Sequence, residues 1–122
     1  MERRCKGSVT VVGAGIGGPV VAMYLKWAGF EVSLVEARAS EAEAEGAFLG
    51  MAPNGMSALE PLGLARVVAA RGHAVSAFEL TNGAGRLLGR IDRGSDAERL
   101  GHALTMIRRG ELHVLLAHAA RE

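Results

Sequence analysis

The sequence has little of what typifies secreted, membrane-bound or nucleic-acid-binding proteins. Among 122 residues there is one cysteine, aromatic residues make up 4%, and the formal net charge is only +1. Cys5, as a single thiol, cannot form an intrachain disulfide, which favours a reducing cytoplasm. The small net charge gives no attraction to nucleic acid, and the scarce aromatic residues offer no surface for stacking bases. We therefore expect a cytoplasmic protein with no nucleic-acid partner.

Long apolar runs are also missing. No segment reaches the ~18 uninterrupted apolar residues that a membrane helix needs. The basic start, from Glu2 to Lys6, is followed by an apolar stretch and superficially resembles a signal peptide. Four glycines and a proline between Gly13 and Pro19 interrupt that stretch. We therefore predict neither a signal peptide nor a membrane span.

Glycine, in contrast, is abundant: the chain has 17 glycines, about twice the usual share of roughly 7%. Four of them fall in the segment Gly13-Ala14-Gly15-Ile16-Gly17-Gly18. Ser8 to Val12, before it, is β-branched and apolar, as in a strand buried in a parallel sheet. Helical spacing of apolar residues follows as far as Gly29, and Glu31 to Val35 is a second such strand. This order predicts a βαβ unit.

Each glycine of this G-x-G-x-x-G segment has a mechanical reason in a dinucleotide-binding turn. Gly13 permits the tight turn, Gly15 lets a pyrophosphate approach the backbone, and Gly18 lets the helix pack closely against the strand. The N–H groups at the helix start, which include those of Ile16 and Gly17, have no intrahelical acceptor and are suited to bind the pyrophosphate. The alternative is a helix that needs glycine for clearance alone.

An acidic residue completes the motif. Glu36 follows the second strand, 18 residues beyond Gly18. Its carboxylate can accept hydrogen bonds from a ribose there and would repel the 2′-phosphate of NADP. Ala37 and Arg38 follow at the adenosine end, although a plain surface arginine explains Arg38 nearly as well. The turn and the acid do not distinguish FAD from NAD.

The remainder of the chain carries weaker patterns. Ser40 to Glu45 is acidic and suits the surface, and Gly46 to Ala52 suggests a buried loop before two short helices. β-prone runs on either side of Asn82-Gly83 predict a hairpin, Gly94 to Arg99 a polar loop, and the chain after Gly110 a helix. We assign no catalytic side chain. We also assign no metal site, because the histidines at 113 and 118 are about 140° apart around a helix.

Three segments carry a family resemblance. VTVVGAGIGGPVVAMYLKWAGFEVSLVEARA resembles the opening of FAD-dependent monooxygenases of the aromatic-hydroxylase class, the class A flavoproteins. GAFLGMAPNGMSALEPLGL and MIRRGELHVLLAHA resemble two later parts of that family, the second through an R-x-x-L pattern at Arg109 and Leu112. The spacing between the segments also fits, so the resemblance spans nearly the whole chain.

The resemblance implies an α/β fold: an incomplete Rossmann-like FAD-binding domain with an inserted β-hairpin and a C-terminal helix, as one truncated domain over residues 1–122. It implies that Arg109 contacts the flavin cofactor, for which a guanidinium has suitable paired donors; a solvated arginine is the alternative. A complete family member uses FAD, NAD(P)H and O2 to hydroxylate a small organic substrate, such as an aromatic compound or a polyketide.

Family members continue with a third strand and a Gly-Asp motif, which this sequence lacks up to Glu122. We therefore expect a marginally stable chain that self-associates or pairs with a complementing chain. Three hypotheses remain: the FAD-binding part of a monooxygenase, a non-catalytic module that binds FAD or NAD weakly, and a non-functional remnant. An NAD-dependent dehydrogenase is a lesser alternative, against which the hairpin argues.

Overall fold

The structure, a computed structural model, describes residues 5–38 and 46–122. The chain forms two compact units, the first comprising residues 1–47 and 108–122 and the second Phe48–Ile107. The predicted surface segment from Ser40 to Glu45 lies outside the described residues. Within the described ranges, no helix has both the length and the apolar character needed to cross a bilayer.

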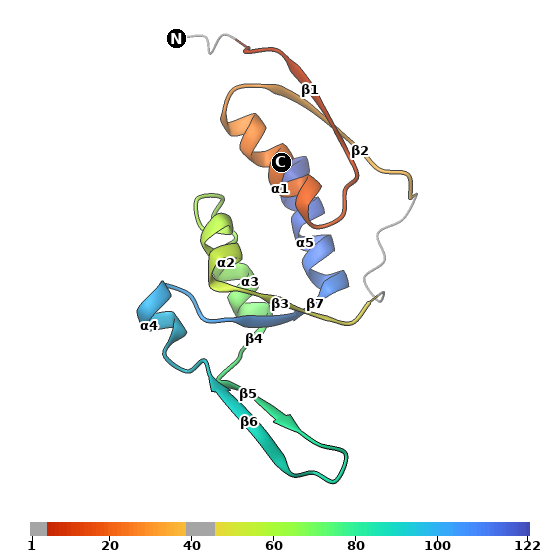
Figure 1. Ribbon diagram of the computed structural model, residues 1–122. Helices are drawn as coiled ribbons and strands as arrows, with labels where there is room; N and C mark the ends of the chain where they lie inside the picture. Colours follow the sequence, from red (N-terminus) through yellow and green to blue (C-terminus); the bar gives the residue numbers. More distant parts are fainter. Residues whose placement is uncertain (1–4, 39–45) are drawn as a thin grey trace. The chain divides into compact units, whose positions relative to one another are not determined.

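The first unit contains the predicted βαβ arrangement. Strand β1 (Ser8–Val12) and strand β2 (Glu31–Val35) pair in parallel, in a register that runs from Ser8 opposite Glu31 to Val12 opposite Val35. Helix α1 (Gly17–Trp27) connects the two strands and packs on them (Figure 1). The helix stops before Gly29, whose φ of 95° is a conformation that favours glycine. The element order and parallel pairing predicted from the sequence are confirmed.

Both strands are less buried than their sequences predict. Alternate side chains of the two strands are half-buried and exposed, and the exposed set ends in Val12 and Val35, with 82% and 46% of their surface accessible. The reason is that α1 covers one face of this two-stranded sheet, where Val32 and Leu34 lie near Ala22 of the helix. An apolar strand sequence is typical of a buried strand, but it does not show whether other elements cover both faces of the sheet.

Helix α5 (Arg109–Arg121) completes the first unit and packs beside α1. The predicted helix is confirmed, and one of its faces buries Leu112, Leu115 and Leu116. A polar contact accompanies the packing: Lys26 Nζ of α1 donates to the carbonyl oxygen of Ala120 at 3.1 Å.

The second unit has a helical part and a small sheet. Helices α2 (Pro53–Leu59) and α3 (Ala65–Arg71) pack together, and strand β7 (Thr105–Arg108) lies between β3 (Phe48–Met51) and β4 (His73–Ala74). The side chains of this unit with 2% or less of their surface exposed are Met56, Leu59, Val68 and Ile107.

Strand β3 corrects the prediction of a buried loop from Gly46 to Ala52. The strand pairs with β7, and its outermost residue, Phe48, has 60% of its surface exposed. The missing side chain of Gly50 leaves room for Met106 of β7, because a Cβ built at Gly50 would lie 3.3 Å from Met106 Sδ. A strand of four residues that includes a glycine has too little alternation of apolar and polar residues to be recognised from sequence.

The predicted hairpin is confirmed as β5 (Ala77–Thr81) and β6 (Leu87–Asp92), which pair antiparallel. Asn82 starts the turn: its N–H donates to the Arg86 carbonyl at 3.0 Å, and its side-chain oxygen accepts from the N–H groups of Ala84 and Arg86. Large apolar residues of the hairpin are exposed, by 44% to 59%: Phe78, Leu80, Leu87, Leu88 and Ile91.

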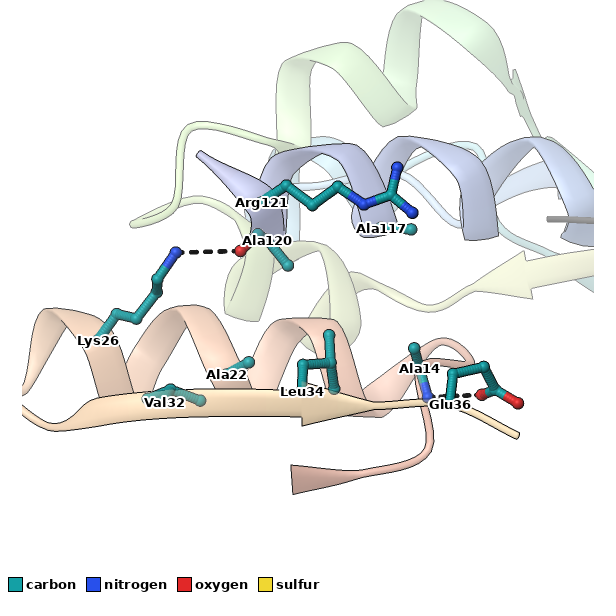
Figure 2. Close-up of a pocket in the computed structure, with 9 residues that line it drawn as sticks. All are labelled: Ala14, Ala22, Lys26, Val32, Leu34, Glu36, Ala117, Ala120 and Arg121. Atoms are coloured by element: carbon teal, nitrogen blue, oxygen red, sulfur yellow. Dashed lines mark hydrogen bonds between the residues drawn. The ribbon is translucent and has the colours of Figure 1, made fainter. Parts of the chain in front are cut away.

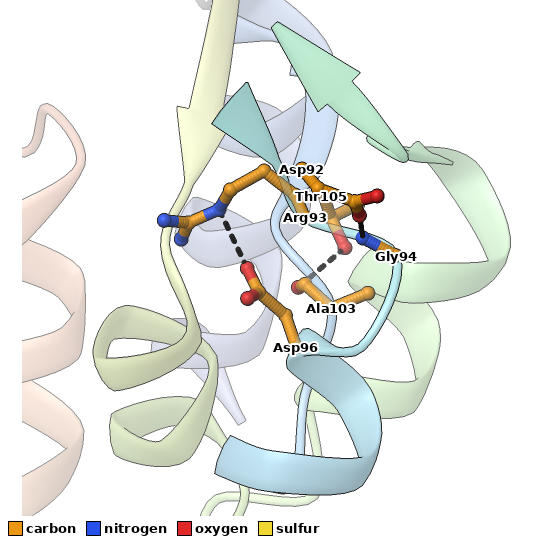
Figure 3. Close-up of polar contacts among 6 residues, drawn as sticks. All are labelled: Asp92, Arg93, Gly94, Asp96, Ala103 and Thr105. Carbon is orange, nitrogen blue, oxygen red and sulfur yellow. Dashed lines mark hydrogen bonds and ion pairs between the residues drawn. The ribbon is translucent and has the colours of Figure 1, made fainter. Parts of the chain in front are cut away.

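Helix α4 (Asp96–Leu100) replaces the loop predicted from Gly94 to Arg99. Figure 3 shows the polar contacts at its start: Arg93 Nε lies 2.7 Å from Asp96 Oδ2, and Asp92 accepts from the Gly94 N–H at 2.7 Å. Asp96 is only 4% exposed, so the ion pair is largely desolvated on the carboxylate side. The helix ends at Gly101, which has a φ of 83°.

Candidate active site

The glycine turn joins the end of β1 to the start of α1, with the geometry that its spacing predicts. Gly13 has a φ of 98°, and its N–H donates to the Val35 carbonyl at 2.7 Å, which ties the turn to the end of β2. A Cβ built at Gly18 would lie 1.8 Å from the Gly13 carbonyl oxygen, so only glycine allows α1 to start this close to the strand.

Gly15 and Gly17 differ from Gly18. A Cβ built at either one meets no atom within 4 Å. These two glycines are therefore not needed for packing within the described residues, and they leave an open backbone surface at the N-terminus of an 11-residue helix. Ile16 lies between them as the N-cap, with no side-chain capping bond. Such a surface fits a diphosphate, which binds to free N–H groups and is favoured by the helix dipole.

Glu36 is bound to this turn by its own carboxylate. One oxygen accepts from the N–H of Ala14 at 2.7 Å, and the other accepts from the N–H of Arg38 at 3.0 Å. The hydrogen bonds from Arg38 and then Ala14, with a smaller contribution from Ala37, hold the pKa of Glu36 below its ordinary value of 4.5. The side chain is exposed, and an ionised carboxylate has about four acceptor positions, so it can still accept from a ribose hydroxyl.

Arg109 lies at the N-terminus of α5. Its N–H donates to the Ala47 carbonyl at 3.1 Å, and its Cβ and Cδ lie 3.5 Å from the place where Gly46 would carry a Cβ. Gly46 has a φ of 100°. The aliphatic part of the Arg109 side chain therefore lies against Gly46. The structure thus brings the turn, Glu36, Ala37 and Arg38 together, and places Arg109 on a separate element.

His113 is the residue that sequence reasoning missed. Its Nε2 lies 2.7 Å from the carbonyl oxygen of Ala14, although the two residues are 99 positions apart in the chain. On sequence grounds, this histidine is considered only as a possible metal ligand, a role that its angular separation from His118 excludes. One signal was available: His113 follows Arg109 by four residues, which puts both on the same face of α5.

A pocket of about 230 Å³ extends from the turn along α1 (Figure 2). Ala14 and Glu36 lie at one end of it and Lys26 at the other. Small and branched apolar side chains line most of the space between them, and Arg121 of α5 lies on the facing side. Apolar side chains therefore line much of the pocket, and charged side chains lie at its two ends and, with Arg121, on the α5 side.

The family of the chain follows from comparison with known proteins. Residues 6–122 match the family model described as "FAD binding domain". The chain belongs to this family. FAD is accordingly its cofactor, and the prediction of a class A flavoprotein from the three sequence segments is confirmed.

Curated relatives support the same assignment for this FAD-binding domain. It is 36% identical over 118 residues to 3-hydroxybenzoate 6-hydroxylase of Polaromonas naphthalenivorans (strain CJ2), which covers 93% of this chain and 29% of the relative. It is 34% identical over 122 residues to phenazine 1,6-dicarboxylic acid hydroxylase PhzS of Lysobacter antibioticus, covering 100% and 30%. The chain thus spans less than a third of the length of these two relatives.

Solved structures of similar proteins have the same fold as this chain. The FAD-binding domain superposes on 2-methyl-3-hydroxypyridine-5-carboxylic acid oxygenase, in its tetrameric form, with a TM-score of 0.80 and 25% identity, covering 97% of this chain and 29% of the other. It also superposes on Klebsiella pneumoniae HpxO complexed with FAD and uric acid, with a TM-score of 0.78 and 24% identity, covering 92% and 28%. The predicted Rossmann-like α/β fold is confirmed.

Proposed function

We propose that the chain supplies the FAD-binding part of a flavin-dependent monooxygenase that hydroxylates a small organic substrate, aromatic or polyketide. The observation that carries the proposal is the open backbone at Gly15 and Gly17, together with a Glu36 carboxylate fixed beside it. The family match makes FAD the ligand, and the hydroxylase names of the relatives support the reaction type. A bound flavin would supply the redox chemistry of the reaction, in which electrons from NAD(P)H reduce O2 so that one oxygen atom enters the substrate and the other leaves as water.

The residues of this chain bind and orient the cofactor in this proposal. The N–H groups at the start of α1 bind the diphosphate, with Gly13, Gly15, Ile16, Gly17 and Gly18 setting the backbone path. Glu36 accepts from the adenosine ribose, beside Ala37 and Arg38. Arg109 contacts the cofactor through its guanidinium, which is exposed and has paired donors for phosphate or ribityl oxygens. No side chain of this chain is assigned to the chemical step.

The test has two stages, which separate binding from turnover. The purified chain is first examined for flavin absorbance and titrated with FAD, while quenching of flavin fluorescence is followed. It is then assayed for NADH and NADPH oxidation with a panel of hydroxybenzoates and related aromatic acids. FAD binding with substrate-stimulated oxidation supports the proposal. FAD binding without oxidation supports the alternative of a non-catalytic nucleotide-binding module, and absence of both supports a remnant.

We also propose that the isolated chain self-associates or pairs with a complementing chain. The exposed apolar side chains of the β5–β6 hairpin, Phe78, Leu80 and Ile91 among them, support this, because an apolar hairpin surface in water favours association. Sedimentation velocity of the purified chain tests the proposal. A stable monomer with a high melting temperature would contradict it.

A further inference from the structure

The peptide groups on either side of Ala14 are both held by side chains from distant parts of the first unit. The Ala14 N–H donates to Glu36 Oε2 at 2.7 Å, and the Ala14 carbonyl oxygen lies 2.7 Å from His113 Nε2. A carbonyl oxygen only accepts, so His113 must carry its proton on Nε2 and donate it. The hydrogen bond therefore requires the Nε2–H tautomer or the protonated ring.

This hydrogen bond has a geometric consequence for the next residue. The Ala14 carbonyl and the Gly15 N–H belong to one planar trans peptide, in which they point in opposite directions. Fixing the carbonyl toward His113 therefore fixes the Gly15 N–H away from α5. Among the described residues, the Gly15 N–H has no acceptor in the turn, and the position of its missing Cβ is open. The N–H is thus available to a ligand.

Without His113 this peptide would be poorly restrained. Ala14 lies between two glycines, and glycine permits a wide range of backbone angles, so the 14–15 peptide can rotate at small steric cost. The Glu36 contact restrains only the preceding peptide, because the N–H of Ala14 is part of the 13–14 plane. Two side chains are therefore needed to hold two consecutive peptides, and His113 holds the one that includes the Gly15 N–H.

We propose that His113 is a positioning residue for the cofactor diphosphate. By donating to the Ala14 carbonyl from α5, it orients the Gly15 N–H so that this donor is directed at the bound anion. His113 itself does not contact the cofactor in this role. The inference rests on the proposed FAD site, but the orientation of the 14–15 peptide can be measured without FAD.

Three variants separate this role from simple packing of α5. His113→Leu keeps a side chain of similar bulk but removes the donor, and His113→Gln keeps an N–H donor at a similar reach. His118→Leu, an exposed position about 140° around the same helix, is the matched control. We expect His113→Leu to raise the Kd for FAD roughly 3- to 10-fold, which is the effect of about one hydrogen bond. His113→Gln should restore most of the affinity, and His118→Leu should leave it unchanged.

Nuclear magnetic resonance of the FAD-free chain provides the second readout. A ¹⁵N-labelled His113 ring should show the Nε2–H tautomer or the protonated ring, and the Gly15 amide resonance should shift in His113→Leu but not in His118→Leu. An Nδ1–H tautomer, or an unmoved Gly15 resonance, would overturn the proposal. So would a folded His113→Gln that binds FAD as weakly as His113→Leu. If the wild-type chain fails to bind FAD, the proposed function fails, and the two resonance measurements alone decide the role of His113.

Discussion

The contrast between Gly17 and Gly18 gives the sharpest test of the turn geometry. The two glycines are neighbours in the first turn of α1, but a Cβ at Gly18 would lie 1.8 Å from the Gly13 carbonyl oxygen and one at Gly17 would meet nothing within 4 Å. A normal contact between carbon and a carbonyl oxygen is about 3.3 Å, so Gly18→Ala must separate helix and turn by roughly 1.5 Å. Both groups belong to backbone, which cannot move aside as a flexible side chain does.

The expected decrease in the free energy of unfolding can be estimated from the contacts that this separation disturbs. Overpacking alone costs about 1–3 kcal/mol. The shift also strains two hydrogen bonds of the turn, from Gly13 N–H to Val35 and from Ala14 N–H to Glu36, each worth about 1 kcal/mol. Replacing a helical glycine by alanine returns up to about 1 kcal/mol. We therefore expect Gly18→Ala to lower the free energy of unfolding by about 2–4 kcal/mol.

Gly17→Ala is the matched control, because it adds the same methyl group one residue earlier. It should leave the free energy of unfolding unchanged or raise it by about 0.5 kcal/mol through helix propensity. Urea unfolding followed by far-ultraviolet circular dichroism measures both variants, provided that the dependence of the free energy on urea stays the same. If Gly18→Ala is as stable as Gly17→Ala, the close approach of α1 to the turn is refuted.

Four further changes probe the site and the second unit. Gly15→Ala should leave the free energy of unfolding nearly unchanged but raise the Kd for FAD more than about 10-fold, because its methyl group occupies the open backbone surface. Arg109→Ala should weaken FAD binding roughly 5- to 20-fold in the same fluorescence titration through the loss of a charge-assisted contact. The lowered pKa of Glu36 contributes free energy of unfolding that is present above pH 4.5 and is lost as the pH falls through that pKa. Glu36→Gln should remove this contribution, as urea unfolding at several pH values would show. Arg93→Met should lower the free energy of unfolding by about 2–3 kcal/mol, because it leaves the buried carboxylate of Asp96 without a cation.

Each of these changes has a matched comparison. Gly89→Ala, on the hairpin and equally open, should not affect FAD binding. Arg108→Ala removes the neighbouring exposed arginine, and equal losses from both arginines would argue against a specific role for Arg109. Glu31→Gln measures the background effect of removing one carboxylate from β2, the strand that precedes Glu36. An identical pH profile for the two variants would contradict the pKa argument. Adding Asp96→Leu to Arg93→Met should recover part of the loss, and no recovery would show that the carboxylate is not the cause.

The parts of the fold that were predictable from sequence are those decided locally. The order of strand, glycine turn, helix and strand rests on residues within one short segment, and the predicted reasons for Gly13 and Gly18 agree with the φ and the close contact seen in the structure. The hairpin at Asn82 was predictable for the same reason, since its turn residues lie between its strands. Helix α4 was missed although Gly101 marks its end, because its five residues are mostly polar and show no apolar face.

The parts that were not predictable depend on contacts between distant residues. The burial of β1 and β2 was overestimated because an apolar strand sequence cannot tell how many faces other elements cover. The role of Asp96 was missed although Arg93 is only three residues away, because the burial of its carboxylate depends on packing that the local sequence does not show. The contact of His113 with Ala14 spans 99 residues, and no spacing rule connects a glycine motif to a helix that far along the chain.

The glycine motif therefore determines only part of the geometry of the turn. Its residues set the path of the backbone, but the directions of its peptides depend on Glu36 and His113, which lie outside the motif. A chain with all four glycines intact but a different side chain at either position would keep the sequence signature and lose the orientation of a donor. Because the motif alone fits any dinucleotide, affinity for FAD should depend as strongly on the second strand and on α5 as on the glycines themselves. The comparison of Gly15→Ala with His113→Leu measures these two contributions on the same N–H group.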